Sequence, residues 1–459
     1  MVRNMAQNFS PAAFPGAPVR RTELEYLINS IQQGHCCAVV GPSNTGKSLL
    51  LKSLPLDEVR QHCARTGHKA PVIVFVDCLE AGNSEQSFYE LMLRRTLEEL
   101  VTSDVSASTV EGLRNLHREV LGANNEVFVR SLYSSGVRRL SREDDLQVVF
   151  ILDEFYDVFR HLPPWPFRQL RALYDSLDTK ICYITATSHH LEQLRSDVET
   201  YEFRELFHMH TLVLHPLTPA EAQTFVTYLA DRQGTAISNE NAVRLIEWSG
   251  GHPGLLERIF ALLSTTASDM VSNPITLEPA ALLQVRPIMK ECRRLWSELE
   301  AEHDALFTLV EHGPERLTPG QNQLLEGKGL IVRDNNEPMI FSPLFALFVE
   351  QELLTRSETI NRGLRCDFES GQIWVDDQEM TLQLSEPQRQ LINYLYQRAG
   401  MVCTYDEIAI GVWGIGEGVS PGAIYELVKR VRQKIEPDWK QPRYIVTVPG
   451  KGYRLENTA

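Results

Sequence analysis

The residues of this chain whose types and spacing best fit a defined chemistry run from Gly41 to Ser48. This run has the spacing of a phosphate-binding loop, with an apolar stretch before it and a helical pattern after it. Glycines let backbone N–H groups approach phosphates, and the N-terminus of the following helix adds its positive dipole end. We expect Lys47 to reach the β- and γ-phosphates and the Ser48 hydroxyl to coordinate Mg²⁺. The predicted nucleotide-binding positions of the loop are Gly41, Pro42, Ser43, Asn44, Thr45, Gly46, Lys47 and Ser48.

A pair of acids forms the expected second half of such a site. The apolar run 148–152 delivers Asp153 and Glu154 at the end of a predicted strand. Asp153 can hold Mg²⁺ through its water shell, since hard oxygen ligands suit this ion. Glu154 can orient and deprotonate an attacking water, which makes it the candidate catalytic base beside Lys47.

A second predicted strand ends in hydroxyl side chains. The run 181–186 is apolar and continues into Thr187 and Ser188. Either side chain could sense a γ-phosphate or position water at this edge of the sheet. A simple cap of the strand end is an open alternative for both.

The last hundred residues carry a different chemistry. From Gly422 to Arg454 there are eight basic and three acidic residues, a net of +5 in a chain whose total charge is −15. A locally basic face on an acidic body is typical of a protein that touches nucleic acid through one small module. The helix expected over 421–435 has one apolar face and one basic face, and a hairpin with a lysine at its tip is expected over 444–455.

Alternating strands and helices must position the first site. The apolar runs 36–40, 72–76, 148–152, 181–186 and 212–214 alternate with helical patterns, which predicts a parallel α/β sheet buried on both faces. From about residue 218 the pattern becomes helical. Leu330 to Val332 and Met339 to Phe341 flank an Asn335-Asn336 turn, which predicts a small winged-helix-like unit.

Bulk properties agree with a cytoplasmic protein that has no membrane segment. The chain has 459 residues, 43% hydrophobic and 23% charged, so several domains are expected. No apolar run reaches the roughly 18 residues of a bilayer span, and no secretory signal is recognisable. The eight cysteines form no CxxC pair, which argues against a zinc ribbon, and several are expected in the core.

The first part of the chain resembles the AAA-like domain of bacterial STAND-type ATPases, relatives of the initiator-type AAA+ ATPases. The resemblance covers about residues 14–263 and includes Phe14 to Val19, the loop, the two acids, and the segment from Ser249 to Leu256. It implies binding of ATP or ADP and a switch that closes with ADP and assembles with ATP. It also implies that Gly251, His252 and Pro253 sense the nucleotide, although an interhelical turn is the alternative for this segment.

The C-terminal part resembles the OmpR/PhoB-type winged helix-turn-helix effector domain over about residues 364–455. The resemblance rests on the runs 429–435 and 446–454, and it implies binding of double-stranded DNA. Leu427 and Pro449 depart from the family pattern. The residues that the resemblance assigns to DNA contacts are Lys429, Arg430, Arg432, Thr447, Lys451 and Tyr453.

The sequence thus predicts a multidomain α/β plus α+β protein. The predicted parts are an N-terminal arm (1–20), a P-loop ATPase core of AAA+/STAND type (21–217), a helical lid (218–284), a winged-helix-like unit (285–355), a linker (356–363) and an OmpR/PhoB-type domain (364–459).

The function that follows is an ATP-dependent transcription regulator and slow ATPase, in which ATP drives homo-oligomerisation and DNA binding. One alternative is a STAND-type signalling or defence ATPase whose winged helices bind a protein partner. Another is an initiator- or transposition-like ATPase that remodels DNA, which would need an arginine finger such as Arg204.

Overall fold

The computed structural model describes residues 19–64, 69–101, 105–266, 270–271, 278–334, 337–361, 363–368, 370–376, 378–414, 419–436 and 438–456. The predicted arm as far as Pro18 and the Asn335-Asn336 turn lie outside these residues. The described residues fall into two compact units that divide between Val349 and Glu350.

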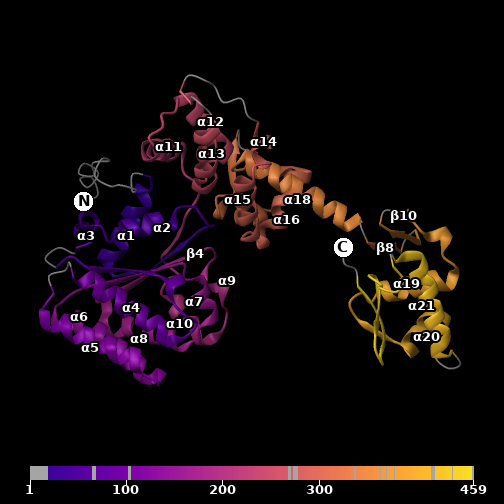
Figure 1. The fold of residues 1–459 in the computed structure, drawn as a ribbon, viewed down its shortest axis with the longest axis horizontal. Helices are drawn as coiled ribbons and strands as arrows, with labels where there is room; N and C mark the ends of the chain where they lie inside the picture. Colours follow the sequence, from indigo (N-terminus) through magenta and orange to yellow (C-terminus); the bar gives the residue numbers. More distant parts are fainter. Residues whose placement is uncertain are drawn as a thin grey trace. The chain divides into compact units, whose positions relative to one another are not determined.

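The first unit is built on a five-stranded parallel sheet with the order β2-β3-β4-β1-β5 (Figure 1). The five apolar runs predicted as strands are these strands, with ends within a residue of the prediction. Every residue of β3 and β4 is buried, as expected for central strands covered on both faces. The strands are β1 (Cys37–Val40), β2 (Val72–Asp77), β3 (Val148–Asp153), β4 (Ile181–Thr187) and β5 (Thr211–Val213).

Helices cover both faces of this sheet. Figure 1 shows α1 and α2 on one side and α4, α5, α6 and α8 on the other. The helices of this layer are α1 (Arg21–Gln33), α2 (Lys47–Ser53), α3 (Asp57–His62), α4 (Glu85–Leu100), α5 (Ala107–Gly122), α6 (Glu126–Glu143), α7 (Tyr156–His161), α8 (Trp165–Leu177), α9 (Leu191–Leu194) and α10 (Tyr201–Glu205). Short 3₁₀ turns are η1 (Cys78–Glu80), η2 (Asp178–Lys180) and η3 (Val198–Thr200).

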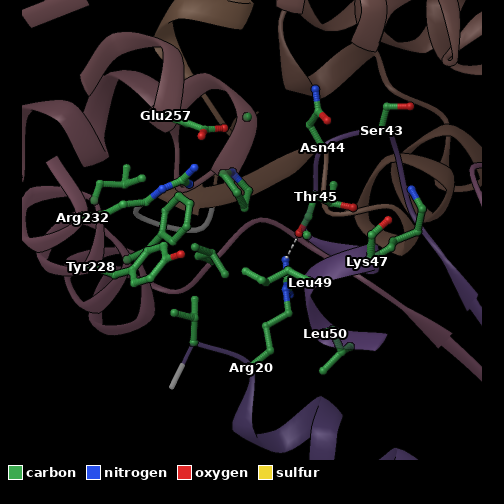
Figure 2. A pocket seen from close by; sticks show the side chains of 18 of the residues that line it. Arg20, Ser43, Asn44, Thr45, Lys47, Leu49, Leu50, Tyr228, Arg232 and Glu257 are labelled. Carbon is green, nitrogen blue, oxygen red and sulfur yellow. Dashed lines mark hydrogen bonds between the residues drawn. The ribbon is translucent and has the colours of Figure 1, made fainter. Parts of the chain in front are cut away.

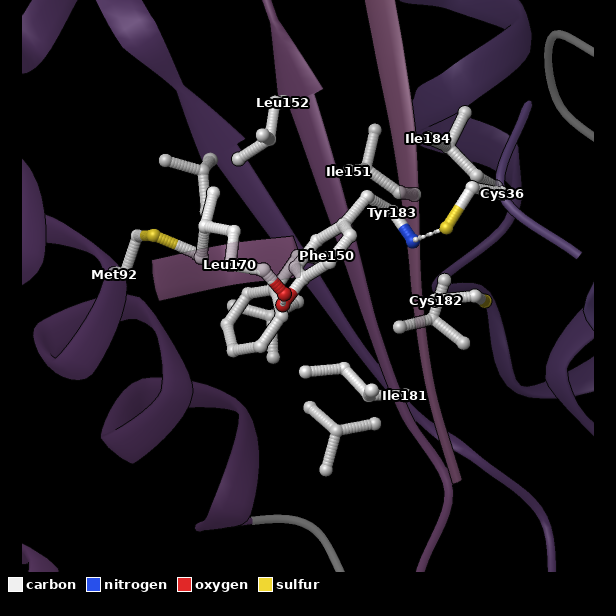
Figure 3. Packing of buried hydrophobic residues seen from close by; sticks show 14 of the residues in the cluster. Cys36, Met92, Phe150, Ile151, Leu152, Leu170, Ile181, Cys182, Tyr183 and Ile184 are labelled. Atoms are coloured by element: carbon white, nitrogen blue, oxygen red, sulfur yellow. Dashed lines mark hydrogen bonds between the residues drawn. The ribbon is translucent and has the colours of Figure 1, made fainter. Parts of the chain in front are cut away.

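The core between these layers is aromatic and closely packed. Figure 3 shows Phe150 and Tyr183 side by side on neighbouring strands, with ring centroids 6.2 Å apart. The thiol of Cys36 accepts a hydrogen bond from the backbone N–H of Tyr183 at 3.3 Å. All eight cysteines of the chain are buried and free, so the expectation of core thiols is confirmed.

Helices follow the sheet, as the sequence predicts. Thr218 and Glu221 form a capping box at the start of the first of them, which satisfies its free N–H groups. These helices are α11 (Pro219–Gln233), α12 (Asn239–Ser249), α13 (Pro253–Thr266), α14 (Pro279–Leu283), α15 (Arg286–Ser297), α16 (His303–His312) and α17 (Pro319–Gly327), with η4 (Glu300–Glu302) and η5 (Pro314–Arg316) between them.

A two-stranded antiparallel hairpin and a long helix complete this part of the chain. The strands are β6 (Ile331–Asp334) and β7 (Glu337–Ile340), with Ile331 opposite Ile340 and Asp334 opposite Glu337. The helix α18 (Pro343–Asn361) begins in the first unit, and the range predicted as a linker is helical as far as Asn361.

The second unit has the winged-helix arrangement that the sequence predicts. Two three-stranded antiparallel sheets, in the orders β10-β9-β8 and β11-β13-β12, accompany three helices. Thr404 and Glu407 form a capping box at the start of the second of these helices. The elements are β8 (Leu364–Asp367), β9 (Gln372–Val375), β10 (Gln378–Glu379), η6 (Thr381–Gln383), α19 (Glu386–Tyr396), β11 (Val402–Thr404), α20 (Tyr405–Trp413), α21 (Pro421–Ile435), β12 (Ile445–Val448) and β13 (Gly452–Leu455).

Candidate functional site

The phosphate-binding loop connects the end of β1 to the start of α2, as the sequence predicts. Lys47 is buried, and its ammonium donates to the carbonyls of Gly41 and Pro42 at 2.6 and 2.9 Å. The Thr45 hydroxyl donates to the Pro42 carbonyl at 2.8 Å. Burial lowers the pKa of Lys47, while the carboxylates of Glu298, Glu154 and Asp153 oppose that shift. The loop is therefore held rigidly by its own side chains.

Two residues of the site have left-handed backbone conformations. Asn44 has a φ of 60° in the loop, and Glu154 has a φ of 51° at the end of β3. For residues with a side chain this conformation is uncommon, and it is concentrated at functional sites. Both positions belong to the predicted nucleotide site.

The Mg²⁺ ligands predicted from the sequence lie next to each other. The Ser48 hydroxyl donates to the Asp153 carboxylate, and the backbone N–H of Glu154 donates to Asp153 Oδ1 at 3.1 Å. Burial raises the pKa of Asp153, and burial together with Asp153 raises that of Glu154. A hydroxyl and a carboxylate are both hard oxygen donors, the kind of ligand that suits Mg²⁺.

The end of β4 makes local contacts. Thr187 is 2% exposed, and its hydroxyl donates to the His189 carbonyl at 2.7 Å. The Ser188 hydroxyl lies 2.9 Å from His189 Nδ1. These bonds close the turn after the strand, and they are the contacts expected of a strand-end cap.

A cavity of about 250 Å³ opens beside the loop. Figure 2 shows the loop residues on one side and Tyr228, Arg232 and Glu257, from α11 and α13, on the other. Of the predicted site residues, Ser43 to Ser48, Glu154 and Pro253 line this cavity. Its apolar wall consists of Val19, Leu49, Leu50, Leu217, Phe225, Tyr228 and Leu229.

The segment from Gly251 to Gly254 packs directly against the loop. The Gly254 N–H donates to the Asn44 carbonyl at 3.1 Å, and a Cβ at Gly254 would lie 2.7 Å from the Asn44 Cβ. His252 is 1% exposed beside the backbone of Ser43. Burial and the cations of Arg20 and Lys47 lower the pKa of His252 to about 3, so its ring is neutral at pH 7. The segment is thus both an interhelical turn and a wall of the site.

Sequence reasoning missed two groups of charged residues at the loop. Arg20 is 6% exposed and donates to the Thr45 carbonyl at 2.7 Å. From α15, Glu291 accepts from the Asn44 side chain at 2.7 Å, and Glu298, just after the helix, accepts from the Ser43 N–H at 2.6 Å. Nothing in the local sequence distinguishes these residues, because their partners are distant in the chain.

Arg204, the candidate arginine finger, makes its contacts within its own segment of the chain. Arg204 is 8% exposed, and its guanidinium donates to the Asp197 carbonyl at 2.9 Å and lies over the ring of Tyr201. A buried guanidinium held by its own chain stabilises the turn that contains it.

The second unit presents the predicted basic surface on α21 and the β12–β13 hairpin. The apolar face of α21 is buried, including Leu427 at 9% exposed, so Leu427 is a core residue. Arg430, Thr447 and Lys451 are exposed, and Lys429 is partly exposed beside Glu426, 3.6 Å away.

Two predicted DNA-contact residues lie inward. The Arg432 guanidinium donates to the Ile445 carbonyl at 2.9 and 2.6 Å and to the Thr447 hydroxyl at 2.8 Å. Tyr453 is 2% exposed and packs edge-on against Tyr405. Arg432 thus joins α21 to β12 and lies over the ring of Tyr453, while Tyr453 packs against α20.

Two family models match separate parts of the chain. The family model described as "Novel STAND NTPase 1" matches residues 14–282, more than half of the chain. The model "Transcriptional regulatory protein, C terminal" matches residues 377–455.

Two curated relatives each match a short part of the chain. The sensory transduction protein RegX3 of Mycobacterium leprae is 37% identical over 94 residues, which are 20% of this chain and 46% of that protein. The transcriptional regulatory protein YvrH of Bacillus subtilis is 37% identical over 66 residues, 14% of this chain and 28% of that protein. The chain therefore spans less than half the length of these relatives.

Solved structures match a large part of the chain at low identity. The Walker-type ATPase PABY2304 of Pyrococcus abyssi is 15% identical with a TM-score of 0.46, covering 72% of this chain and 95% of its own. The ORC2 protein of Aeropyrum pernix in ADPNP–ADP complexes is 14% identical with a TM-score of 0.43, covering 76% and 97%.

None of the helices in the described ranges combines the length and apolar character that spanning a bilayer demands. The loop, the acid pair and the extent of the family match lead to one assignment: this chain belongs to the Novel STAND NTPase 1 family and carries a C-terminal domain of the transcriptional regulatory protein type.

Proposed function

We propose that this chain is an ATP-controlled transcription regulator, in which the nucleotide at the P-loop sets the oligomeric state and, through it, DNA binding. The observation that carries the proposal is the cavity at the loop, in a chain that also carries a transcriptional-regulator domain. One side of the cavity offers phosphate-binding N–H groups, and the other is apolar and aromatic, as a nucleotide with a flat base requires.

Hydrolysis of ATP would reset this switch. Asp153 and Ser48 would hold Mg²⁺, which would neutralise charge on the β- and γ-phosphates. Lys47 would turn from its loop carbonyls toward the phosphates. Glu154, whose pKa is raised by burial and by Asp153, would accept the proton of the attacking water. Glu154→Gln should keep nucleotide binding and lose hydrolysis, measured as phosphate release.

The C-terminal domain would bind double-stranded DNA through its exposed basic residues. A single small module makes few phosphate contacts, so its affinity alone is low. Assembly of several copies on repeated half-sites would raise the effective concentration of each module without any new contact. ATP binding would promote this assembly, and the protein would act as a slow ATPase and homo-oligomer.

Gel-shift titrations of promoter fragments with Mg-ATP test this coupling. Lys47→Ala should abolish cooperative DNA binding, because Lys47 is the loop cation. Lys52→Ala is the matched control, since Lys52 lies exposed on the same helix and contacts the Phe75 ring. Equal cooperative binding by Lys47→Ala and wild type would exclude control by the nucleotide.

A protein partner is the second candidate for the C-terminal unit. Arg432 and Tyr453 are engaged within the unit, and α20 exposes Ile410 by 57% and Trp413 by 36%. DNA affinity that falls steeply with salt supports the first candidate. The absence of binding to any duplex at about 50 mM salt supports the second.

A further inference from the structure

A carboxylate from outside the nucleotide-binding core occupies the donors of the phosphate loop. Glu298 directly follows α15, and its Oε2 accepts from the backbone N–H of Ser43 at 2.6 Å. Its Oε1 accepts from the hydroxyl of the same serine. A carboxylate that accepts two donors of a phosphate-binding loop presents the loop with the charge and the acceptor oxygens of a phosphate.

Contacts of neighbouring residues keep Glu298 and the end of α15 next to the loop. The negative charge of Glu298 opposes the lowering of the pKa of the Lys47 ammonium that burial causes. The ring of His189, in the turn after β4, hydrogen-bonds the backbone of Glu298. Seven residues earlier, in α15, the Glu291 carboxylate accepts a hydrogen bond from the Asn44 side chain. The end of α15 is therefore fastened to the loop and to the end of the neighbouring strand.

The position of this carboxylate corresponds to one end of a bound triphosphate. In a P-loop, the N–H groups at the start of α2 receive the β-phosphate, and Lys47 reaches onward to the γ-phosphate. Glu298 contacts Ser43, four residues before Lys47, and its charge acts on the pKa of the Lys47 ammonium. A carboxylate there coincides with the place of the γ-phosphate and leaves the start of α2 to the β-phosphate.

We propose that Glu298 determines nucleotide specificity by competing with the γ-phosphate for Ser43 and Lys47, so that the structure accepts ADP and must expel Glu298 to accept ATP. This inference rests on the proposed nucleotide binding. One backbone N–H cannot serve both acceptors, and two negative groups at this distance repel each other. ATP would thus break the contacts of the α15 end with Ser43, and ADP would leave them in place.

Displacement of Glu298 would transmit the nucleotide state to the following residues. Glu298 is the C-cap of α15 and immediately precedes η4 and α16. Its release from Ser43 would detach this part of the winged-helix-like unit (285–355) from the phosphate-binding loop. The γ-phosphate therefore acts on a segment about 250 residues away in sequence through one side chain.

Isothermal titration of nucleotide-stripped full-length protein with Mg-ADP and Mg-AMP-PNP tests the proposal. Glu298→Ala should raise the affinity for AMP-PNP by about tenfold or more, since charge-assisted hydrogen bonds no longer have to be broken. The affinity for ADP should change by less than about threefold. Glu298→Gln, which keeps shape and loses charge, should give a smaller gain. Glu300→Gln, an exposed acid in η4, is the matched control.

The outcomes separate this inference from the proposed function. Unchanged affinities for both nucleotides in Glu298→Ala overturn the inference and leave nucleotide binding intact. An equal gain for ADP and AMP-PNP also overturns it, because Glu298 would then exclude any nucleotide. Failure of wild type to bind either nucleotide overturns the proposed function itself. Thermal unfolding of each variant shows that it is folded.

Discussion

The guanidinium of Arg20 donates to the backbone carbonyl of Thr45 at 2.7 Å and to that of His215 at 2.8 Å. One buried cation thereby joins three segments: the residues before α1, the phosphate-binding loop and the approach to α11. It also pairs with Glu23 at 3.0 Å. Because the loop and the segment that leads into α11 are bonded to the same side chain, Arg20 contributes both to stability and to the shape of the cavity that it lines.

Removal of Arg20 should therefore destabilise the first unit. Arg20→Ala leaves two carbonyls without their donor, and we expect a loss of about 1–3 kcal/mol in the free energy of unfolding. Arg21→Ala is the control, because Arg21 and Glu25 form an ion pair in which both side chains are about half exposed, with an expected effect under about 1 kcal/mol. Equal losses in urea unfolding of the two variants would contradict the role of Arg20.

The neutral His252 should make stability depend on pH. Its pKa is about 3 in the folded chain and about 6.5 when unfolded, so between these values only the unfolded state binds the proton. The contribution of neutral His252 to the free energy of unfolding is therefore fully present above pH 6.5, and it falls as the pH is lowered. The expected loss at pH 5 is about 2 kcal/mol.

His252→Gln removes this proton uptake and keeps a polar side chain. The difference in unfolding free energy between wild type and variant should shift in favour of the variant as the pH falls from 7 to 5. Carboxylates titrate in both proteins and largely cancel in the difference. If the unfolding free energies of wild type and variant, measured in urea, fall in parallel from pH 7 to pH 5, His252 does not take up a proton on unfolding.

Glu436 should be essential for the stability of the second unit. Its buried carboxylate accepts from the backbone N–H groups of Arg443, Tyr444 and Ile445 at 2.6, 2.9 and 2.9 Å. Glu436→Ala leaves these three donors unpaired, and we expect a loss of about 3 kcal/mol or more. Glu426→Ala on the exposed face of α21 should cost less than about 1 kcal/mol. Circular dichroism during thermal unfolding measures both, and similar midpoints would refute the distinction.

Among the basic residues of α21, Arg430 should contact DNA and Arg432 should stabilise the fold. Arg430→Ala should lower the slope of log affinity against log salt by about 1 and leave the melting temperature unchanged. Arg432→Ala should lower the melting temperature, because it removes the bonds to Ile445 and Thr447. Fluorescence anisotropy with a labelled duplex at several salt concentrations measures the first effect. A stable Arg432→Ala protein with a reduced salt slope would reverse the assignment.

Local patterns were sufficient to predict the sheet and the loop. The strands are recognisable because central parallel strands are apolar at every position, and the loop because its glycines and lysine have fixed spacing. Capping residues such as Thr404 with Glu407 fix helix starts through contacts only three residues apart. Such features depend on neighbours in sequence and can be found without a structure.

Contacts between distant segments were not predictable in the same way. Glu298 and Ser43 are separated by 255 residues, and an acid near a helix end is indistinguishable in sequence from a solvated one. Arg432 illustrates the converse, since a basic residue on a basic helix is expected outside and here bonds the hairpin. Only the packing of elements decides which charged residues are internal.

The burial of every cysteine has a practical consequence. All eight thiols are buried, and burial raises the pKa of Cys36 and Cys37 to about 12. Reagents that attack thiolates therefore find no reactive cysteine on the surface of the folded protein. A single cysteine introduced at an exposed position would then be the one site that a maleimide fluorophore modifies in the native protein. Pairs of such labels would allow single-molecule energy transfer to follow domain movements without any deletion of natural residues.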